Sequence, residues 1–159
     1  MTDARDEPGR LLDGFVVRAM EPADAVALGE LERQARAALV DARGGASLLA
    51  EQAAVGDWSS LDDDQHVWVA EIDGAAVGYL HLHHPQGSPT GHVRQVYLDP
   101  EAREVGFGDE LLAAAIARLR ERGATAVESW ALPGDRDTKN LFERAGVTAR
   151  KLVVSKRIV

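Results

Sequence analysis

The residues best placed to do chemistry are an arginine and two glycines in the segment Arg103-Glu104-Val105-Gly106-Phe107-Gly108. The segment follows a strand-like run that ends at Asp99-Pro100 and comes directly before an amphipathic pattern typical of a helix. Glycines let a backbone approach a ligand closely, and the first N–H groups of a helix have no partner within it. The segment therefore predicts a nest of main-chain amides that binds phosphate or diphosphate, with the charge of Arg103 nearby.

Two other phosphate-binding loops also use glycines, and their spacing can be checked. A dinucleotide fingerprint that starts at Gly106 needs a third glycine where Leu111 stands, and the Walker loop needs Gly-Lys-Ser/Thr, which is absent. Both are poor matches. A plain tight turn with a helix cap remains the alternative for an isolated Gly-x-Gly.

Alternation and helical spacing outline the elements that must position this loop. Strands are expected at 15–19, 66–71, 76–83, 92–98 and 126–131, with a hairpin turn at Asp73-Gly74 and a last strand near Leu152. Helices are expected at about 22–39, 47–55, 109–122 and 133–145, the third ended by Gly123. The strand at 126–131 should run parallel to the strand before the loop, because the helix between them makes a right-handed crossover.

The order of segments from about Gly91 to Ser155 resembles the GNAT superfamily of N-acetyltransferases. Arg-x-x-Gly-x-Gly is similar to the acetyl-CoA pyrophosphate loop of that family, and Asn140–Gly146 is similar to its aliphatic-Tyr-x-x-x-Gly-Phe segment. The resemblance implies a mixed α/β fold with about four helices. Its central sheet would have six to seven mostly antiparallel strands, with one parallel pair splayed at the CoA cleft.

The same resemblance implies a binding site for acetyl-CoA as co-substrate. The pantetheine would lie along the strand before the loop and the diphosphate on the amides of the loop. The implied cofactor-binding residues are Val96, Tyr97, Leu98, Arg103, Glu104, Val105, Gly106, Phe107, Gly108, Asp109, Asp135, Asn140 and Phe142.

Some of these residues depart from the family pattern. Phe142 stands where the family often has a tyrosine that protonates the leaving thiolate, and Glu104 and Val105 replace small or basic residues. Asp109 adds a negative charge, although an acid at that position also caps a helix well.

A base must deprotonate the amine acceptor, since a free amine has a pKa near ~10. His92, at the start of the strand before the loop, is one candidate, and Glu128 on the following strand is the other. Gln95 cannot take a proton. His81 and His83 share one strand face, but no third ligand is evident, so no metal is expected.

Composition limits the class of protein further. The chain has 159 residues, 45% of them apolar, which suits one domain at residues 14–159 after a flexible N-terminal arm at residues 1–13. Without cysteine, thiol chemistry and cysteine zinc sites are excluded. The sequence has no membrane span and no secretory signal, so a cytoplasmic location is expected.

The net charge of −8 disfavours nucleic acid and anionic lipid and would attract cationic substrates, although solubility is the simpler explanation. Residues of the first two helices and the loop after them are candidates to select a cationic amine: Glu30, Glu32, Glu51, Asp57 and Trp58.

The predicted function is transfer of an acetyl group from acetyl-CoA directly to a primary amine, either a small molecule or a protein N-terminus or lysine. The alternative is a non-catalytic CoA-binding sensor or dimerisation domain that kept the fold after losing its general acid. Phe142 and the acidic loop favour this alternative. A homodimer through the last strand is a further expectation.

Overall fold

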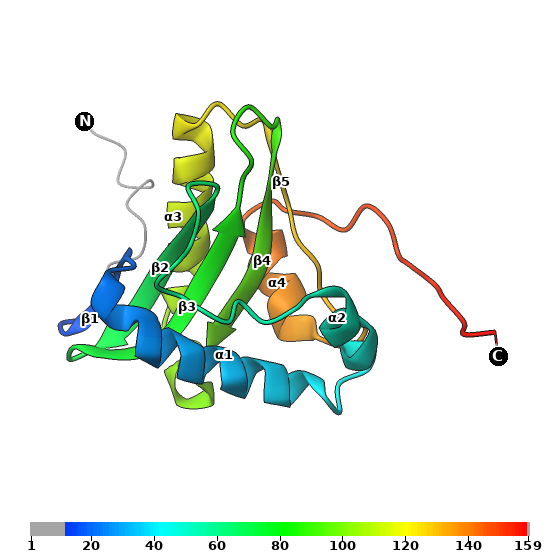
Figure 1. Cartoon of the computed structure of the whole chain (residues 1–159), viewed down its shortest axis with the longest axis horizontal. Helices are drawn as coiled ribbons and strands as arrows, with labels where there is room; N and C mark the ends of the chain where they lie inside the picture. The colour runs from blue at the N-terminus through cyan, green and yellow to red at the C-terminus, as the bar shows by residue number, and fades with distance from the viewer. Residues whose placement is uncertain (1–11, 159) are drawn as a thin grey trace.

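The computed structural model describes residues 12–158, so the N-terminal arm expected at residues 1–13 lies outside the described residues except for Leu12 and Asp13. Five strands and four α-helices are present in the described part (Figure 1). The elements are β1 (Phe15–Ala19), α1 (Ala25–Leu39), α2 (Gly45–Glu51), β2 (Gln65–Ile72), β3 (Ala75–His83), β4 (Thr90–Leu98), α3 (Phe107–Glu121), β5 (Ala126–Glu128) and α4 (Arg136–Arg144). None of these helices is both long and apolar enough to cross a bilayer.

The strands form one sheet in the order β1-β2-β3-β4-β5. All neighbouring pairs are antiparallel except β4 and β5, which run parallel, as the sequence predicted. The β2–β3 hairpin turns at Asp73 and Gly74, whose φ angles of 50° and 82° match the left-handed conformation that a tight hairpin requires. The mixed α/β fold class is confirmed.

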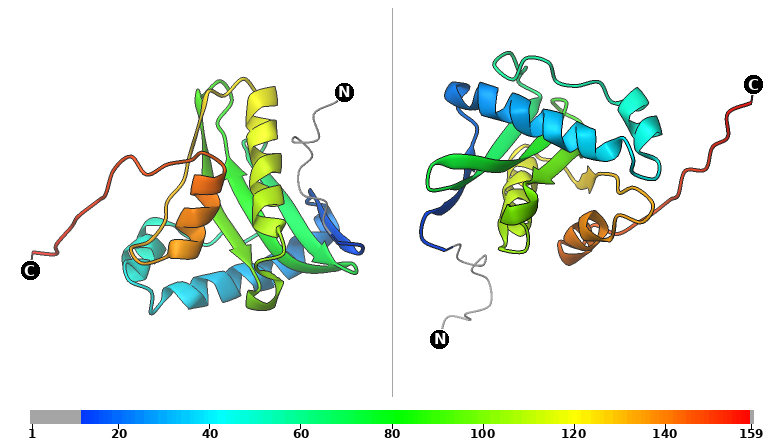
Figure 2. Two further views of the ribbon diagram at one scale, coloured as in Figure 1. Left: turned by 180° about the vertical axis from the view of Figure 1, so that it is seen from behind. Right: turned by 90° about the horizontal axis from the view of Figure 1, so that it is seen from below.

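Each face of the sheet is covered by a pair of helices. Helices α1 and α2 lie on one side and α3 and α4 on the other (Figure 2). Leu28 and Leu31 of α1 pack with Trp58 and Tyr79, and helical spacing explains why these two leucines point the same way. On the opposite face the core includes Phe107, whose ring stacks on that of Phe15 at a centroid distance of 5.3 Å.

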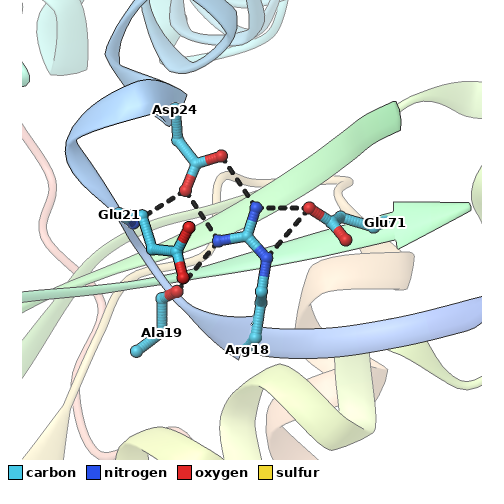
Figure 3. A network of polar contacts seen from close by, with 5 residues as sticks. All are labelled: Arg18, Ala19, Glu21, Asp24 and Glu71. Atoms are coloured by element: carbon cyan, nitrogen blue, oxygen red, sulfur yellow. Dashed lines mark hydrogen bonds and ion pairs between the residues drawn. The ribbon is translucent and has the colours of Figure 1, made fainter. Parts of the chain in front are cut away.

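A partly buried charge network links the start of α1 to the sheet (Figure 3). The guanidinium of Arg18 in β1 donates to both carboxylate oxygens of Asp24 at 2.7 and 2.8 Å, and its Nε donates to Glu71 of β2 at 2.9 Å. Asp24 also accepts from the main-chain N–H of Glu21 at 2.7 Å. The hydrogen bonds from Arg18 lower the pKa of Asp24 and, with those to Glu71, raise the pKa of Arg18. The same bonds tie Asp24, which directly precedes α1, to β1 and β2.

The C-terminal segment differs from the prediction. The strand expected near Leu152 is not formed in the described residues, so the sheet has five strands instead of six or seven. The segment runs away from the sheet (Figure 1), and Leu152, Val153 and Val154 are 78%, 80% and 84% exposed. β-Branched residues favour a strand only where a neighbouring strand takes up their main-chain hydrogen bonds, and this segment meets none among residues 12–158.

Candidate active site

The candidate site begins where β4 and β5 separate. The two strands pair only through Thr90–His92 and Ala126–Glu128. Immediately afterwards, Ser129 Oγ donates to the Val93 carbonyl at 2.9 Å and Trp130 Nε1 donates to the Arg94 carbonyl at 3.0 Å. These side chains take the place of the main-chain ladder, which is why β5 ends before the predicted Ala131.

A β-bulge in β4 lies at the same point. His81 of β3 faces Gln95, while the next residue, Leu82, faces Val93, so Arg94 is the extra residue of β4. Consistent with this, Val93 and Val96 pack into the same core although they are three positions apart. A bulge re-aims the side chain of the extra residue and bends the strand, so β4 turns away from β5 here.

The separation of the strands produces a cavity of about 1090 Å³. Its walls come from the C-terminal end of α1, β4, the loop before α3, the segment after β5 and α4. Most of the cofactor-binding residues expected from the sequence line it: Val96, Tyr97, Leu98, Arg103, Glu104, Gly106, Gly108, Asp109, Asp135, Asn140 and Phe142. Val105 and Phe107 do not, because Val105 faces solvent and Phe107 is fully buried in the core. We call this cavity the main cleft.

The loop at one side of the main cleft has the backbone of an anion-binding nest. Glu104 has a φ of 65° and Gly106 a φ of 97°, so left-handed residues alternate with right-handed or extended ones before α3 begins at Phe107. Such alternation points successive N–H groups toward a common point, where the helix dipole adds to their field. Glutamate rarely adopts this conformation, and the residue type alone did not indicate it.

Charged side chains beside the nest are held by partners. Arg103 Nε donates to the Leu98 carbonyl at 3.0 Å, and its guanidinium carbon lies 5.9 Å from the ring centroid of Tyr97. Asp109 Oδ1 accepts from Arg144 Nε at 3.0 Å. The negative charge of Asp109 is therefore offset by Arg144, which the sequence did not single out although it lines the main cleft.

Helix α4 approaches the nest closely because of Gly108. A Cβ at this position would lie 3.1 Å from Leu141 Cδ1, which is tighter than an ordinary contact. Phe142 is 6% exposed and belongs to the core below the main cleft, and it brings no hydroxyl to the cleft. Asp135 caps α4 by accepting from the Thr138 N–H at 3.0 Å, so its position also has a structural explanation.

A second cavity, of about 230 Å³, lies beside the main cleft on the α1 side of the sheet. Leu39, Gln95 and Trp130 line both cavities. The second cavity also includes Glu32, Arg36 and Arg94 in its lining. We call it the side cavity, and the three shared residues mark where it meets the main cleft.

Two polar side chains that line the side cavity, His81 and Gln95, have a defined protonation state and a defined orientation, respectively. His81 is 4% exposed, and burial, with the neighbouring charge of Arg94, lowers its pKa to about 4. The ring is therefore neutral near pH 7, with Nε2 at 2.8 Å from Gln65 Oε1. Gln95 Oε1 accepts from the hydroxyl of Tyr79 at 2.5 Å, so the amide orientation is set.

The two candidate bases lie together but away from both cavities. His92 and Glu128 face each other across β4 and β5, with His92 Nδ1 at 3.7 Å from Glu128 Oε2. Their side chains are 49% and 68% exposed. Neither residue lines the main cleft or the side cavity.

Three of the four acidic residues considered for a cationic substrate, Glu30, Glu32 and Asp57, have structural partners, whereas Glu51 is exposed at the end of α2. Glu30 pairs with Arg33 at 2.6 Å, and Asp57 accepts from Ser59 and Ser60. Trp58 is 2% exposed and donates from its indole to Glu32. Within residues 12–158, no three His, Cys, Asp or Glu side chains are arranged to hold a metal ion.

The fold and the cleft define a class of protein, a mixed α/β domain with a diverging parallel strand pair and an anion nest at the start of the following helix. The profile of the acetyltransferase (GNAT) family matches residues 32–147. The chain belongs to this family.

Individual relatives agree with this assignment. A mycothiol acetyltransferase from Thermomonospora curvata is 33% identical over 86 residues, which cover 54% of this chain and 29% of that protein. A crystal structure of a GCN5-related N-acetyltransferase from Ralstonia eutropha has a TM-score of 0.68 at 25% identity, covering 91% of this chain and 99% of the other. An aminoglycoside N-acetyltransferase solved in complex with CoA has a TM-score of 0.64 at 19% identity, with 90% and 100% covered. The chain spans 29% and 45% of the length of the curated relatives it matches.

Proposed function

We propose that the protein transfers an acetyl group from acetyl-CoA directly to a primary amine, without a covalent enzyme intermediate. The observation that carries this proposal is the main cleft, which opens between β4 and β5 and has the nest of residues 103–109 in its wall. A helix start preceded by a nest suits a diphosphate. A relative of the same fold was solved with CoA, which supports acetyl-CoA as the co-substrate.

In this proposal the diphosphate is bound by the amides between Glu104 and Asp109, and the pantetheine runs along Val96–Leu98. Beyond His92, β4 has no strand partner on its β5 side among the described residues. Side chains take up the carbonyls of Val93, Arg94 and Leu98, so the pantetheine would bind to the main-chain groups that remain at this edge. A free N–H of this edge would stabilise the oxyanion that forms on the acetyl group. Binding of this kind depends on backbone geometry, which explains why it tolerates the unusual loop sequence.

The reaction removes two protons from the acceptor nitrogen and returns one to the leaving thiolate. The acceptor ammonium loses the first proton, its nitrogen attacks the thioester carbonyl, and a C–N bond forms. The nitrogen of the tetrahedral intermediate loses the second proton, the intermediate collapses, the C–S bond breaks, and the CoA thiolate leaves and takes up a proton. The products are the N-acetyl amine, CoA thiol and one proton released to solvent.

Proton transfer relies on water in this proposal. Phe142 has no hydroxyl to protonate the thiolate, but a thiol with a pKa near ~8.5 is a tolerable leaving group without a general acid. His92 and Glu128 stay the proposed bases. Since they line neither cavity, they would accept the proton through intervening water.

A CoA-binding sensor is the less favoured function. The side cavity meets the main cleft at Leu39, Gln95 and Trp130, so an acceptor would have direct access to the thioester. A pure sensor has no need of such a second compartment. A cytoplasmic location and a homodimer stay predictions of the sequence.

The proposal is tested in two stages. Acetyl-CoA at about 100 times its Kd should stabilise the fold by ~2.7 kcal/mol in a thermal-shift titration. CoA release is then measured with a thiol reagent across a panel of amines, and the protein gives no background because it contains no cysteine. No thermal shift at millimolar acetyl-CoA would contradict the proposal, and a shift without turnover of any amine would favour the sensor.

A further inference from the structure

We propose that the acetyl acceptor is a small primary amine that also carries a carboxylate, bound in the side cavity with its carboxylate on the guanidinium of Arg94. This inference rests on the acetyl transfer proposed above and specifies its second substrate. It differs from the expectation, based on the net charge of −8, that cationic substrates are preferred.

The first reason is the placement of Arg94. It is the extra residue of the β4 bulge, and its carbonyl is held by Trp130 Nε1 at 3.0 Å. The residue is half-buried and lines the side cavity, near enough to His81 for its charge to lower the pKa of that ring. Its guanidinium has no hydrogen bond or ion pair to any other residue in the described range 12–158. A half-buried guanidinium without a partner is suited to bind a carboxylate through two parallel hydrogen bonds.

The second reason is the balance of charge in the side cavity. Arg36 adds another guanidinium, of which Nη1 donates to the Gln52 carbonyl at 2.8 Å. Glu32 is the one carboxylate in the described lining, and both its oxygens are already bonded: Oε1 to the Val55 N–H at 2.8 Å and Oε2 to Trp58 Nε1 at 3.0 Å. An anionic group therefore finds an unpaired cation here, whereas a second cationic group finds no free carboxylate.

The third reason is size and geometry. The side cavity measures about 230 Å³, below the ~300–1,000 Å³ of typical sites for drug-sized ligands. Arg94 adjoins Gln95, which lies where the side cavity meets the main cleft. A compact amino carboxylate could thus bind Arg94 at one end and present its amine to the thioester at the other. A polycationic aminoglycoside fits neither the size nor the charge.

The experiment compares matched amines on the full chain. Glycine, alanine and β-alanine are each compared with the corresponding carboxamide, which keeps size and amine but lacks the negative charge, and an aminoglycoside is included. We expect kcat/KM for the acids to exceed that for the amides by ~10- to 100-fold, as for hydrogen bonds to charged groups. Arg94→Gln should abolish most of this preference through KM, and Arg94→Lys should restore part of it.

The control variant is Arg120→Gln, which removes the same charge from an exposed position on α3 outside both cavities. It should leave the preference unchanged, and all variants should bind acetyl-CoA like the wild type. Equal rates for acids and amides, or a preference that survives Arg94→Gln, would overturn the inference.

Failure of the inference can be told apart from failure of the proposed transfer. If acetyl-CoA does not bind, the transfer itself is refuted. If acetyl-CoA binds but no amine turns over, calorimetry with CoA present compares the same acids and amides directly. Equal affinities, or no binding of the acids, would then overturn the inference.

Discussion

Trp130 Nε1 donates a hydrogen bond to the carbonyl oxygen of Arg94 across 3.0 Å, at the point where β5 leaves β4. With the Ser129–Val93 bond, it satisfies main-chain acceptors that a continuing strand would have paired. Since Trp130 lines both cavities and Arg94 lines the side cavity, this single contact joins the wall of the main cleft to the proposed acceptor site.

Trp130→Phe keeps an aromatic wall and removes the N–H donor. We expect the free energy of unfolding to fall by about 0.5–1.5 kcal/mol, the usual net value of one hydrogen bond. Acetyl-CoA should also bind more weakly, because the opening between β4 and the segment after β5 is held less rigidly. Urea unfolding and calorimetry measure the two effects. Trp68→Phe is the control, because Trp68 makes no side-chain hydrogen bond among the described residues, and it should leave the affinity for acetyl-CoA unchanged. An identical effect of both variants would argue against the role of Trp130.

Glu104 combines a left-handed backbone with a negative charge beside the proposed diphosphate site. A non-glycine residue in this left-handed conformation costs roughly 1–2 kcal/mol. Glu104→Gly removes both this cost and the negative charge. Its acetyl-CoA affinity should rise several-fold, with little change in stability because glycine also loses more entropy on folding. Glu104→Gln isolates the charge effect, and Glu101→Gln, outside both cavities, should change nothing. Weaker binding by Glu104→Gly would speak against the nest.

Gly108 lets α4 close on the nest. A methyl group in Gly108→Ala would meet Leu141 at 3.1 Å and enter the main cleft, so acetyl-CoA affinity should fall by about tenfold or more while the domain stays folded. Gly29→Ala is the matched control in α1, where a Cβ lies 4.0 Å from Trp58 and only helix propensity changes, by up to ~1 kcal/mol. If Gly108→Ala binds acetyl-CoA as tightly as the wild type does, acetyl-CoA does not bind beside Gly108.

The neutral His81 predicts a specific pH dependence of stability. Burial lowers its pKa to about 4 in the folded protein, whereas an unfolded histidine titrates near ~6.5. Between these values the unfolded chain binds more protons, so stability falls as the pH drops from about 6.5 to 4. From pH 7 to 4 the wild type should lose about 3 kcal/mol more than His81→Gln, measured by urea unfolding. Parallel pH curves for the two proteins would contradict the buried neutral ring.

His92 and Glu128 should behave as one unit if they accept the proton through water. His92→Gln and Glu128→Gln should each lower kcat by ~10-fold or more and alter the pH–rate profile, and the double variant should be no worse than either alone. Acetyl-CoA affinity should be unchanged. Glu121→Gln, an exposed carboxylate on α3, is the control. An unchanged profile in both single variants would remove the pair as bases.

Much of the fold could be predicted because its signals are local. Alternation outlined β1 to β4, the helical spacing of Leu28 and Leu31 marked α1, and Asp73-Gly74 fixed the hairpin. Gly106 before α3 indicated the nest, since its conformational freedom is a property of the residue itself.

The remaining features depend on contacts between distant segments. The bulge that re-aims Arg94 arises from the register between β3 and β4, and the strand separation from the bonds of Ser129 and Trp130. From the sequence, Glu32 is expected to be an exposed carboxylate, but its side chain is buried against Trp58. The run at Leu152 has strand-forming residues but no partner strand in the part of the chain that the structure describes, so its intrinsic preference was misleading.

The most direct measurement is a crystal structure of the protein with CoA. We predict diphosphate oxygens within hydrogen-bond distance of main-chain nitrogens between Glu104 and Asp109, with the pantetheine between β4 and the segment after β5. A CoA molecule bound outside the main cleft, or one whose diphosphate makes no contact with these amides, would contradict it.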